Sequence, residues 1–359
     1  MAENNLFNLL NLNPYDEEER KLLNVDAIIK EVQNDPRSVE LHYTFSHGKR
    51  CLPLHQALRL KAPLSVIETL CSSVALKQRD NHGDNVLHLA ASHMASVNVM
   101  KLLLEKHPHA VEERGSSDCT PLHEACANQA PIEVIALLVN NWPGALKEKD
   151  HDGYTPLHLA CFEEASMEMV SLMVKSFPDA LKEKDNDGRT PLHIACAEQA
   201  PMELVSLVVN NWRSALKEKD RDGCTPLHVS CAKRAPWEVI TTLLDGLPEA
   251  ITERNNNGET PAILAEAYNA PQISQKLVSY VSRLFDGGIS NPLVVEILSF
   301  FTEIQWWNGV TIALNKHPAV AQIVHIKTMP NFLCLVGRCC KMKTMWKMLC
   351  SKQDLFKDI

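Results

Sequence analysis

Four pairs of histidine and cysteine residues recur at a spacing that would suit metal binding. In each pair the cysteine follows the histidine by three residues, so both side chains would lie on one face of a helix. Imidazole and thiolate are ligands that zinc prefers, but a structural zinc site needs four ligands and each pair offers only two. We therefore expect no metal site. The pairs are His123/Cys126, His158/Cys161, His193/Cys196 and His228/Cys231.

Other motifs of catalysis are missing from the sequence. It contains no nucleophile elbow, phosphate-binding glycine loop, metalloprotease helix or dinucleotide fingerprint, and its 13 glycines fall mostly at turns. Adjacent carboxylates such as Glu163 and Glu164 are interpreted as solvated rather than as an acid and base pair. We expect a protein that is not an enzyme and that holds no cofactor.

The histidines belong to a repeat with a period of 35 residues. The string Thr-Pro-Leu-His begins at Thr120 and returns at each period to Thr225, and a weaker copy begins at Thr260. Shorter matches at Val86 and Pro53 continue the series toward the N-terminus. Seven units are therefore expected.

Each unit can be read as a hairpin followed by two helices, and residues Asp185–Asn211 give the clearest example. Gly188 can take a positive φ at the tip of a tight hairpin. Thr190 can cap a short inner helix, and Pro191 suits the first helical position. A second, outer helix starts after Pro201 and carries apolar residues at helical spacing.

The hairpin Asp185–Gly188 and the motif Thr190-Pro191-Leu192-His193 resemble the ankyrin repeat, and the resemblance covers residues 50–283. It implies an all-α fold with short β-hairpin loops, an ankyrin-repeat α-solenoid with helical caps that is stabilised by stacking. It also implies that the motif histidine braces the hairpin and that the cysteine is a core residue. The usual period is 33, so one extra residue is expected between the helices and another after the outer helix.

The same period divides the chain into four regions. Residues 1–23 are expected to be a mobile N-terminal tail, and residues 24–49 an N-terminal capping half-repeat. Residues 50–283 form the repeat array of about seven units. Residues 284–359 are expected to be a C-terminal helical region made of degenerate repeats and a cap.

Positions that vary between otherwise similar units are candidates for contact with a partner. By resemblance to ankyrin arrays, the hairpin tips and the inner helices line a concave binding face. The recurring segment Lys147–Asp150 is interpreted instead as structural. The variable tip positions are His151, Tyr154, Asn186, Arg189 and Arg221, and the charged positions expected on the inner helices are Glu163, Glu164, Glu198, Lys233 and Arg234.

Composition and charge restrict the kind of partner. Lys and Arg total 36 against 44 for Asp and Glu, and the net charge of −8 argues against general attraction to nucleic acid or anionic lipid. No apolar run is long enough for a transmembrane segment, and the N-terminus lacks the pattern of a secretory signal. We expect a cytoplasmic protein with reduced cysteines, and a nuclear location is the alternative.

These observations predict a scaffold or adaptor that binds another protein through its concave face. The partner itself is not named by the sequence. In the alternative, residues 332–356 form a basic amphipathic helix that binds a calmodulin-like protein or a membrane surface. Its basic residues include Arg338, Lys341 and Lys347, and its apolar residues include Met345 and Trp346. The simpler interpretation of this segment is a capping helix. A metal or redox sensor that uses the thiols is a further alternative.

Overall fold

The computed structural model describes residues 5–45, 48, 50–163, 165–286, 289–318 and 320. The chain forms two compact units, residues 1–194 and residues 195–359, and each is described by itself. Within the described residues the only strands are β1 (Tyr43–Thr44) and β2 (Arg50–Cys51), which pair antiparallel. The all-α fold with short hairpin loops expected from the sequence is thereby confirmed.

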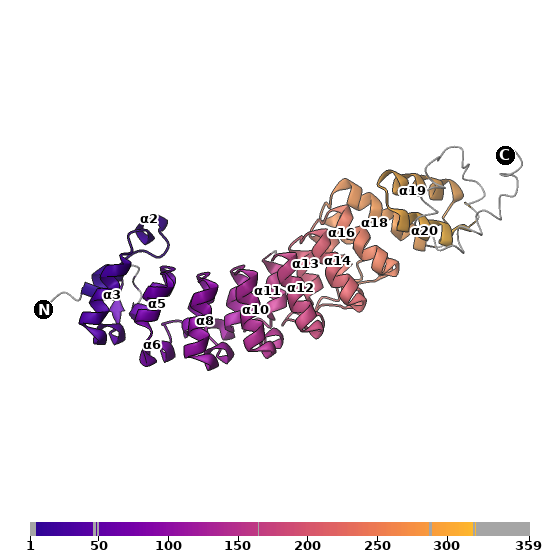
Figure 1. Ribbon diagram of the computed structural model, residues 1–359. Helices are drawn as coiled ribbons and strands as arrows, with labels where there is room; N and C mark the ends of the chain where they lie inside the picture. The colour runs from indigo at the N-terminus through magenta and orange to yellow at the C-terminus, as the bar shows by residue number, and fades with distance from the viewer. Residues whose placement is uncertain are drawn as a thin grey trace, which may run out of the picture. The chain divides into compact units, whose positions relative to one another are not determined.

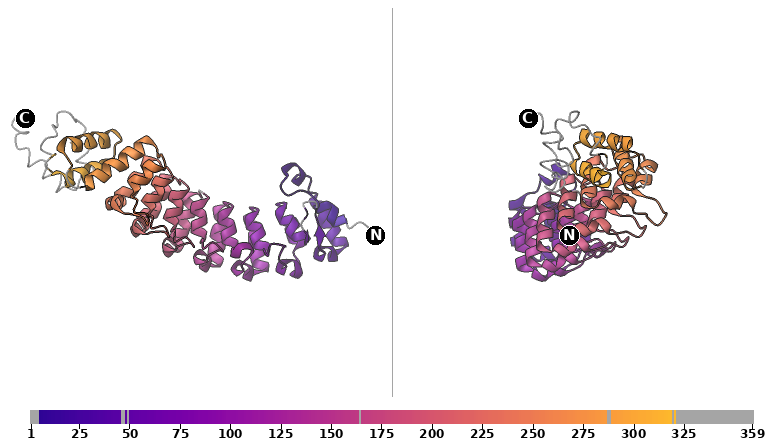
Figure 2. Two further views of the ribbon diagram at one scale, coloured as in Figure 1. Left: turned by 180° about the vertical axis from the view of Figure 1, so that it is seen from behind. Right: turned by 90° about the vertical axis from the view of Figure 1, so that its right-hand side faces the viewer.

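In the first unit, short inner helices alternate with outer helices that are mostly longer. The outer helices lie side by side in chain order, and each inner helix packs on the next inner helix (Figure 1). The view from behind shows the same succession of helices in the first unit (Figure 2). The inner helices are α4 (Pro53–Arg59), α7 (Val86–Ser92), α9 (Pro121–Ala127) and α11 (Pro156–Phe162), and the outer helices are α5 (Leu64–Leu70), α8 (Val97–Lys106), α10 (Ile132–Asn141) and α12 (Met167–Ser176).

Short helical turns complete this unit. After each of the three longer outer helices a proline starts a 3-10 turn, as Pro143 does after Trp142 has ended α10. Proline suits that place because it has no N–H to leave unpaired. The turns are η2 (Pro108–Glu112), η4 (Pro143–Lys147) and η5 (Pro178–Lys182); α6 (Ser73–Lys77) follows α5, and η3 (Ser116–Asp118) forms the tip of one hairpin.

The N-terminal segment is not the mobile tail that we expected. Residues Asn5–Leu10 form helix α1, which packs against α3 (Val25–Asn34) and α4 and buries Leu6 and Leu10 completely. The Gln56 side-chain amide donates hydrogen bonds to the carbonyl oxygens of Leu10 and Leu12, at 3.2 and 2.9 Å. Apolar residues spaced one helical turn apart explain why this segment is held. The exposed helix α2 (Glu17–Arg20) and the turn η1 (Pro36–Glu40) complete the region.

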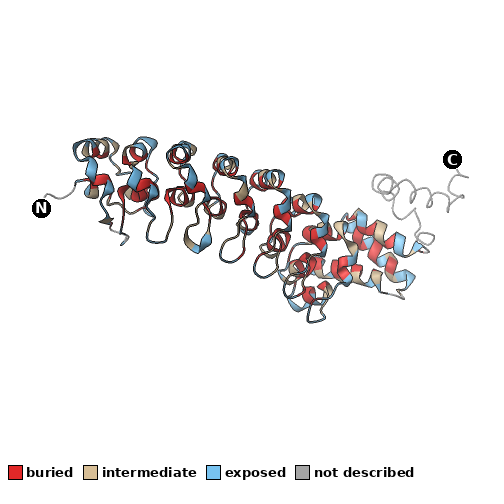
Figure 3. Cartoon of the chain, turned by 90° about the horizontal axis from the view of Figure 1, so that it is seen from below, coloured by how far each residue is buried: buried red, intermediate tan, exposed pale blue. Residues whose placement is uncertain are grey.

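Helix α13 (Pro191–Ala197) contains the boundary between the units, and the second unit continues the alternation. The buried residues of each unit lie on the parts of the helices that face other helices, and exposed residues lie on the outward parts (Figure 3). The helices of the second unit are α14 (Met202–Asn211), α15 (Pro226–Ala232), α16 (Trp237–Gly246), α17 (Pro261–Ala267), α18 (Gln272–Phe285), α19 (Asn291–Glu303) and α20 (Trp307–Lys316), with the turns η6 (Arg213–Lys217) and η7 (Pro248–Thr252).

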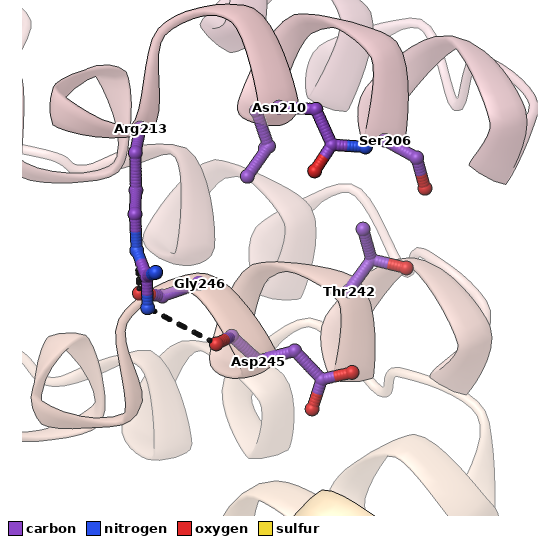
Figure 4. A pocket seen from close by; sticks show the side chains of 7 residues that line it. Ser206, Asn210, Arg213, Thr242, Asp245 and Gly246 are labelled. Carbon is purple, nitrogen blue, oxygen red and sulfur yellow. Dashed lines mark hydrogen bonds between the residues drawn. The ribbon is translucent and has the colours of Figure 1, made fainter.

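A cavity of about 370 Å³ lies between the outer helices α14 and α16. Arg213 stands where four other units have proline, and its Nε donates to the carbonyl oxygen of Gly246 at 2.8 Å (Figure 4). This contact, with a longer one to the carbonyl oxygen of Asp245, occupies C-terminal carbonyls of α16 that have no partner within the helix. The Asp245 carboxylate accepts a 2.7 Å hydrogen bond from Trp306 Nε1, which anchors the turn before α20.

The last Thr-Pro motif lacks its histidine. Ile263 occupies that position on α17, and 46% of its surface is exposed, whereas His228 on α15 is fully buried. No hairpin follows α18 in the described residues; α19 begins a few residues later and packs against α18 and α20. The histidine position is therefore buried only where another hairpin covers it.

Candidate protein-binding surface

The Thr-Pro-Leu-His motif starts the inner helices α9, α11 and α15, and its histidine fixes the next hairpin. In α9 the backbone N–H of Thr120 donates to Nδ1 of His123 at 3.1 Å, and the Thr120 hydroxyl lies 2.8 Å from the same atom. Because Nδ1 accepts a hydrogen bond, the ring proton is on Nε2. That atom donates to the carbonyl oxygen of Tyr154, 3.0 Å away in the following hairpin. The same bond joins His88 to Cys119, His158 to Arg189 and His228 to Glu259.

Burial keeps these rings neutral. It lowers the pKa of both His123 and His158 to about 4, and the hydrogen bonds to carbonyl oxygens oppose this shift only in part. At neutral pH the histidines are therefore hydrogen-bonding braces without charge.

An aspartate or asparagine at the start of most hairpins shapes the tip. The Asp150 carboxylate accepts hydrogen bonds from the backbone N–H groups of Asp152 and Tyr154, at 3.0 and 2.8 Å. Gly153 takes a φ of 81° at the turn, a conformation that favours glycine. Asp185, Asp220 and Asn255 make the same contacts in their own hairpins.

Neighbouring tips of the first unit are bonded to each other. The Asn186 backbone N–H donates to the carbonyl oxygen of Asp152 at 3.0 Å, and its side-chain amide donates to that of His151 at 2.9 Å. Both His151 and Asn186 are exposed, as expected for tip residues, but the Asn186 amide already has a structural role.

Tyr154 and Arg189 are brought together by successive hairpins. The Arg189 guanidinium donates to the Tyr154 hydroxyl at 2.7 Å and lies 5.7 Å from the centre of its ring. It also pairs with Asp185 at 2.7 Å and with Asp187 at 3.1 Å. Both predicted binding residues are half-buried and held rigidly.

A ladder of ion pairs runs along the hairpin bases. Lys149 Nζ lies 3.0 Å from the Glu183 carboxylate and donates to the carbonyl oxygen of Lys184 at 2.8 Å. This ladder gives the recurring Lys-Glu-Lys-Asp segment a structural role. Its other rungs are Arg79 with Glu113 and Arg114 with Glu148 in the first unit, and Lys219 with Glu253 in the second.

The charged pairs expected on the inner helices lie beyond them, in the turns. Helix α9 ends at Ala127, and Gln129 then takes a φ of 51° while the N–H of Ala130 bonds to the carbonyl oxygen of Ala125 at 2.8 Å. A residue with positive φ ends a helix, and here it is not glycine. Gln199 and Arg234 occupy the same position, with φ of 56° and 63°.

The predicted residues of these turns differ in exposure. Glu163 is half-buried and its carbonyl oxygen accepts a 2.6 Å hydrogen bond from Gln129 Nε2, whereas Glu164 lies outside the described residues. In the second unit Glu198 is half-buried, and Lys233 and Arg234 are exposed. Arg221 is exposed at a tip, and its carbonyl oxygen accepts from the Asn256 side chain at 2.8 Å.

One exposed aromatic residue just before these turns escaped the sequence analysis. Phe162 is the last residue of α11 and 44% of its surface is exposed. The corresponding residues Ala127, Ala197 and Ala232 are small. Comparison of this position between the units, one residue before the charged pairs, would have revealed it.

The cysteines of the motif are core residues. Cys126 and Cys161 are fully buried in the first unit, and Cys231 in the second; burial raises the pKa of Cys126 and Cys231 far above the ordinary thiol value. Within the described part of the chain no three potential ligands lie close enough to hold a metal ion. No described helix has both the length and the apolar character needed to cross a membrane.

Comparison with known proteins identifies the repeats. A family model described as ankyrin repeats (3 copies) matches residues 54–148 and residues 122–215. No curated protein gives a significant match to the chain.

Proposed function

Because residues 54–215 of this chain are ankyrin repeats, a class of repeat that generally mediates contacts between proteins, we propose that the first unit binds a partner protein through its hairpin tips and inner-helix ends. We call this surface the tip face, and it comprises Asp152, Tyr154, Phe162, Glu163 and Arg189. The protein is then a non-enzymatic scaffold or adaptor that works in the cytoplasm or the nucleus.

The observation that carries this proposal is the rigid link between Tyr154 and Arg189. The hydroxyl and guanidinium groups are joined at 2.7 Å, and the hairpins that carry them are joined by backbone hydrogen bonds. A partner that binds such a surface has little side-chain or loop entropy to remove. Tyr and Arg are also among the residues that most often dominate binding energy at interfaces.

Affinity capture from a cell lysate with the full-length chain tests the proposal. Phe162→Ala and Asp152→Ala remove exposed side chains from an inner-helix end and a hairpin tip of the first unit, whereas Met167→Ala and Glu133→Ala remove exposed side chains from its outer helices. After circular dichroism has shown that both double variants fold, we expect a protein to be lost only from the first. Identical captured proteins would contradict the proposal.

A second candidate function concerns residues 332–356, which lie outside the described residues. Five basic residues between Arg338 and Lys352 are interleaved with Met and Trp, as in targets of calmodulin-like proteins and in helices that bind membrane surfaces. In this alternative the segment regulates an adaptor whose repeats hold a client. A gel-shift assay with a peptide of residues 330–356 tests the calmodulin version; a shift that requires calcium supports it, and no shift removes it.

A further inference from the structure

Phe162 gives the tip face an apolar anchor. The first unit exposes this aromatic ring where the neighbouring inner helix ends in Ala127. Glu163, the next residue, is half-buried and caps α11. Aromatic side chains exposed beside polar groups are common centres of protein interfaces.

Glu124 places a carboxylate on α9, the inner helix before α11, on the face that corresponds to the Phe162 side of α11. The corresponding residue of α11 is Leu159, so the acid is particular to α9. Burial, together with the charge of Asp84, raises the pKa of Glu124 to about 7. The side-chain amide of Asn128, one turn later, lies 3.5 Å from the Glu124 carboxylate.

A hydrogen bond connects the two helix ends. Gln129, which follows Asn128, donates from its side chain to the carbonyl oxygen of Glu163, directly after Phe162. Glu124 and Asn128 lie one turn apart, as do Leu159 and Glu163, so both pairs line one side of their helices. The acid of α9 and the aromatic ring of α11 therefore belong to adjoining parts of one surface.

The neighbouring basic side chains are already engaged. Arg114 pairs with Glu148, Lys149 pairs with Glu183, and Arg189 pairs with two aspartates of its own hairpin. Asp84 accepts a hydrogen bond from the Ser116 backbone N–H at 2.8 Å. Among the described residues neither Asp84 nor Glu124 has an ion pair.

Building on the proposed function, we propose that the tip face of the first unit, together with Glu124 beside it, binds a partner segment that sets an apolar side chain on Phe162 and a Lys or Arg on Glu124. Burial and the charge of Asp84 disfavour the ionised form of Glu124, and a Lys or Arg placed on its carboxylate would favour that form. An acidic segment would add a further like charge beside Asp84 and Glu124, so the surface selects against it.

A synthetic peptide of alternating Lys and Leu with one labelled Trp is the probe, measured with the full-length chain by fluorescence anisotropy. We expect Glu124→Gln, Asp84→Asn and Phe162→Ala each to weaken binding by about tenfold, which corresponds to about 1.4 kcal/mol. Glu133→Gln and Met167→Ala, which change exposed residues of outer helices, should leave it unchanged. A peptide with Glu in place of Lys, and one with Ser in place of Leu, should bind far more weakly.

Three results would overturn the inference: equal effects of Glu124→Gln and Glu133→Gln, equal binding of the Lys and Glu peptides, or no binding of the Lys peptide. Each leaves the proposed function to be judged by the capture experiment. If capture still depends on Phe162 and Asp152, the tip face binds a partner of another chemistry. If it does not, both proposals fail.

Discussion

His123 and Tyr154 are joined by a hydrogen bond in which the imidazole Nε2–H donates to the backbone carbonyl oxygen at 3.0 Å. The two residues are 31 positions apart, in an inner helix and in the hairpin that follows the next outer helix. The bond therefore fixes the position of one repeat relative to the next, and it requires that the His123 ring be uncharged. Several consequences for stability can be measured.

Acid should weaken the array through these histidines. The pKa of His123 in the folded chain is about 4, below the ordinary value of 6.5, so the stability gained from a neutral ring is complete above about pH 6.5 and is lost as the pH falls toward 4. The full loss amounts to about 3 kcal/mol for this ring. Urea denaturation at a series of pH values measures it.

His123→Gln is the matching variant. It should lower the free energy of unfolding at neutral pH by about 1–3 kcal/mol, because its buried partners lose their bonds. It should also make the decline with acid shallower. His109→Gln changes an exposed histidine and should behave as the wild type; an equal effect of both changes would show that burial of His123 is not responsible.

Substitutions at two glycines distinguish the stability cost of the close contact between hairpins from the cost of backbone strain. Gly153 and Gly258 have similar positive φ values of 81° and 78°. A Cβ on Gly153 would lie 2.6 Å from the Asn186 backbone nitrogen, whereas a Cβ on Gly258 would meet no atom within 4 Å. We expect Gly153→Ala to cost at least about 1 kcal/mol more than Gly258→Ala in thermal denaturation. Equal costs would mean that the hairpins separate easily.

In the turn between an inner and an outer helix, glycine should be at least as stable as the residue that the chain carries at the position of positive φ. Arg234 has a φ of 63° and Lys233 a φ of −87°, and both side chains are exposed and basic. Arg234→Gly should leave the melting temperature unchanged or raise it, because glycine takes positive φ without steric cost. Lys233→Gly should cost about 0.5–1 kcal/mol. The opposite order would contradict the assigned turn.

A buried ion pair near the start of the array should be costly to break. Arg59 and Asp80 form it, and their side chains are only 2% and 1% exposed. Arg59→Met leaves the aspartate buried without its cation, and we expect a loss of about 3–5 kcal/mol in urea denaturation. The double variant Arg59→Met with Asp80→Asn removes both charges and should recover part of that loss. No recovery would show that packing, rather than charge, explains the effect.

Much of the fold follows from the motif, because threonine, proline and histidine each satisfy a specific backbone need. Thr190 stands just before an inner helix, where the sequence predicted it, and its backbone N–H and hydroxyl group bond to Nδ1 of His193. Gly188 takes a φ of 76° in the hairpin before that helix. The end of that helix was misplaced because Gln199, rather than glycine, takes the positive φ. No residue type in the sequence signals such a stop, since the hydrogen bond of the following alanine enforces it.

The candidate surface was predictable in part. Exposure of the tips at His151 and Arg221 follows from hairpin chemistry, but the pairing of Tyr154 with Arg189 depends on how successive units stack, which spacing alone does not give. Phe162 was overlooked although its signal, one aromatic residue among alanines, is present in the sequence. The raised pKa of Glu124 results from burial and from the charge of Asp84 in a neighbouring hairpin, and neither could be read from the sequence.

The ladder of ion pairs along the hairpin bases determines which insertions and deletions the gene of this protein can tolerate. Every rung joins a cation to a glutamate one unit further along, so loss of residues 115–149 would set Arg114 beside Glu183 and His88 beside the Tyr154 carbonyl in place of the present partners. Recombination between two copies of the repeat can therefore shorten or lengthen this protein by whole units while every junction keeps a compatible partner. Insertions and deletions of any other length would shift the rungs out of register.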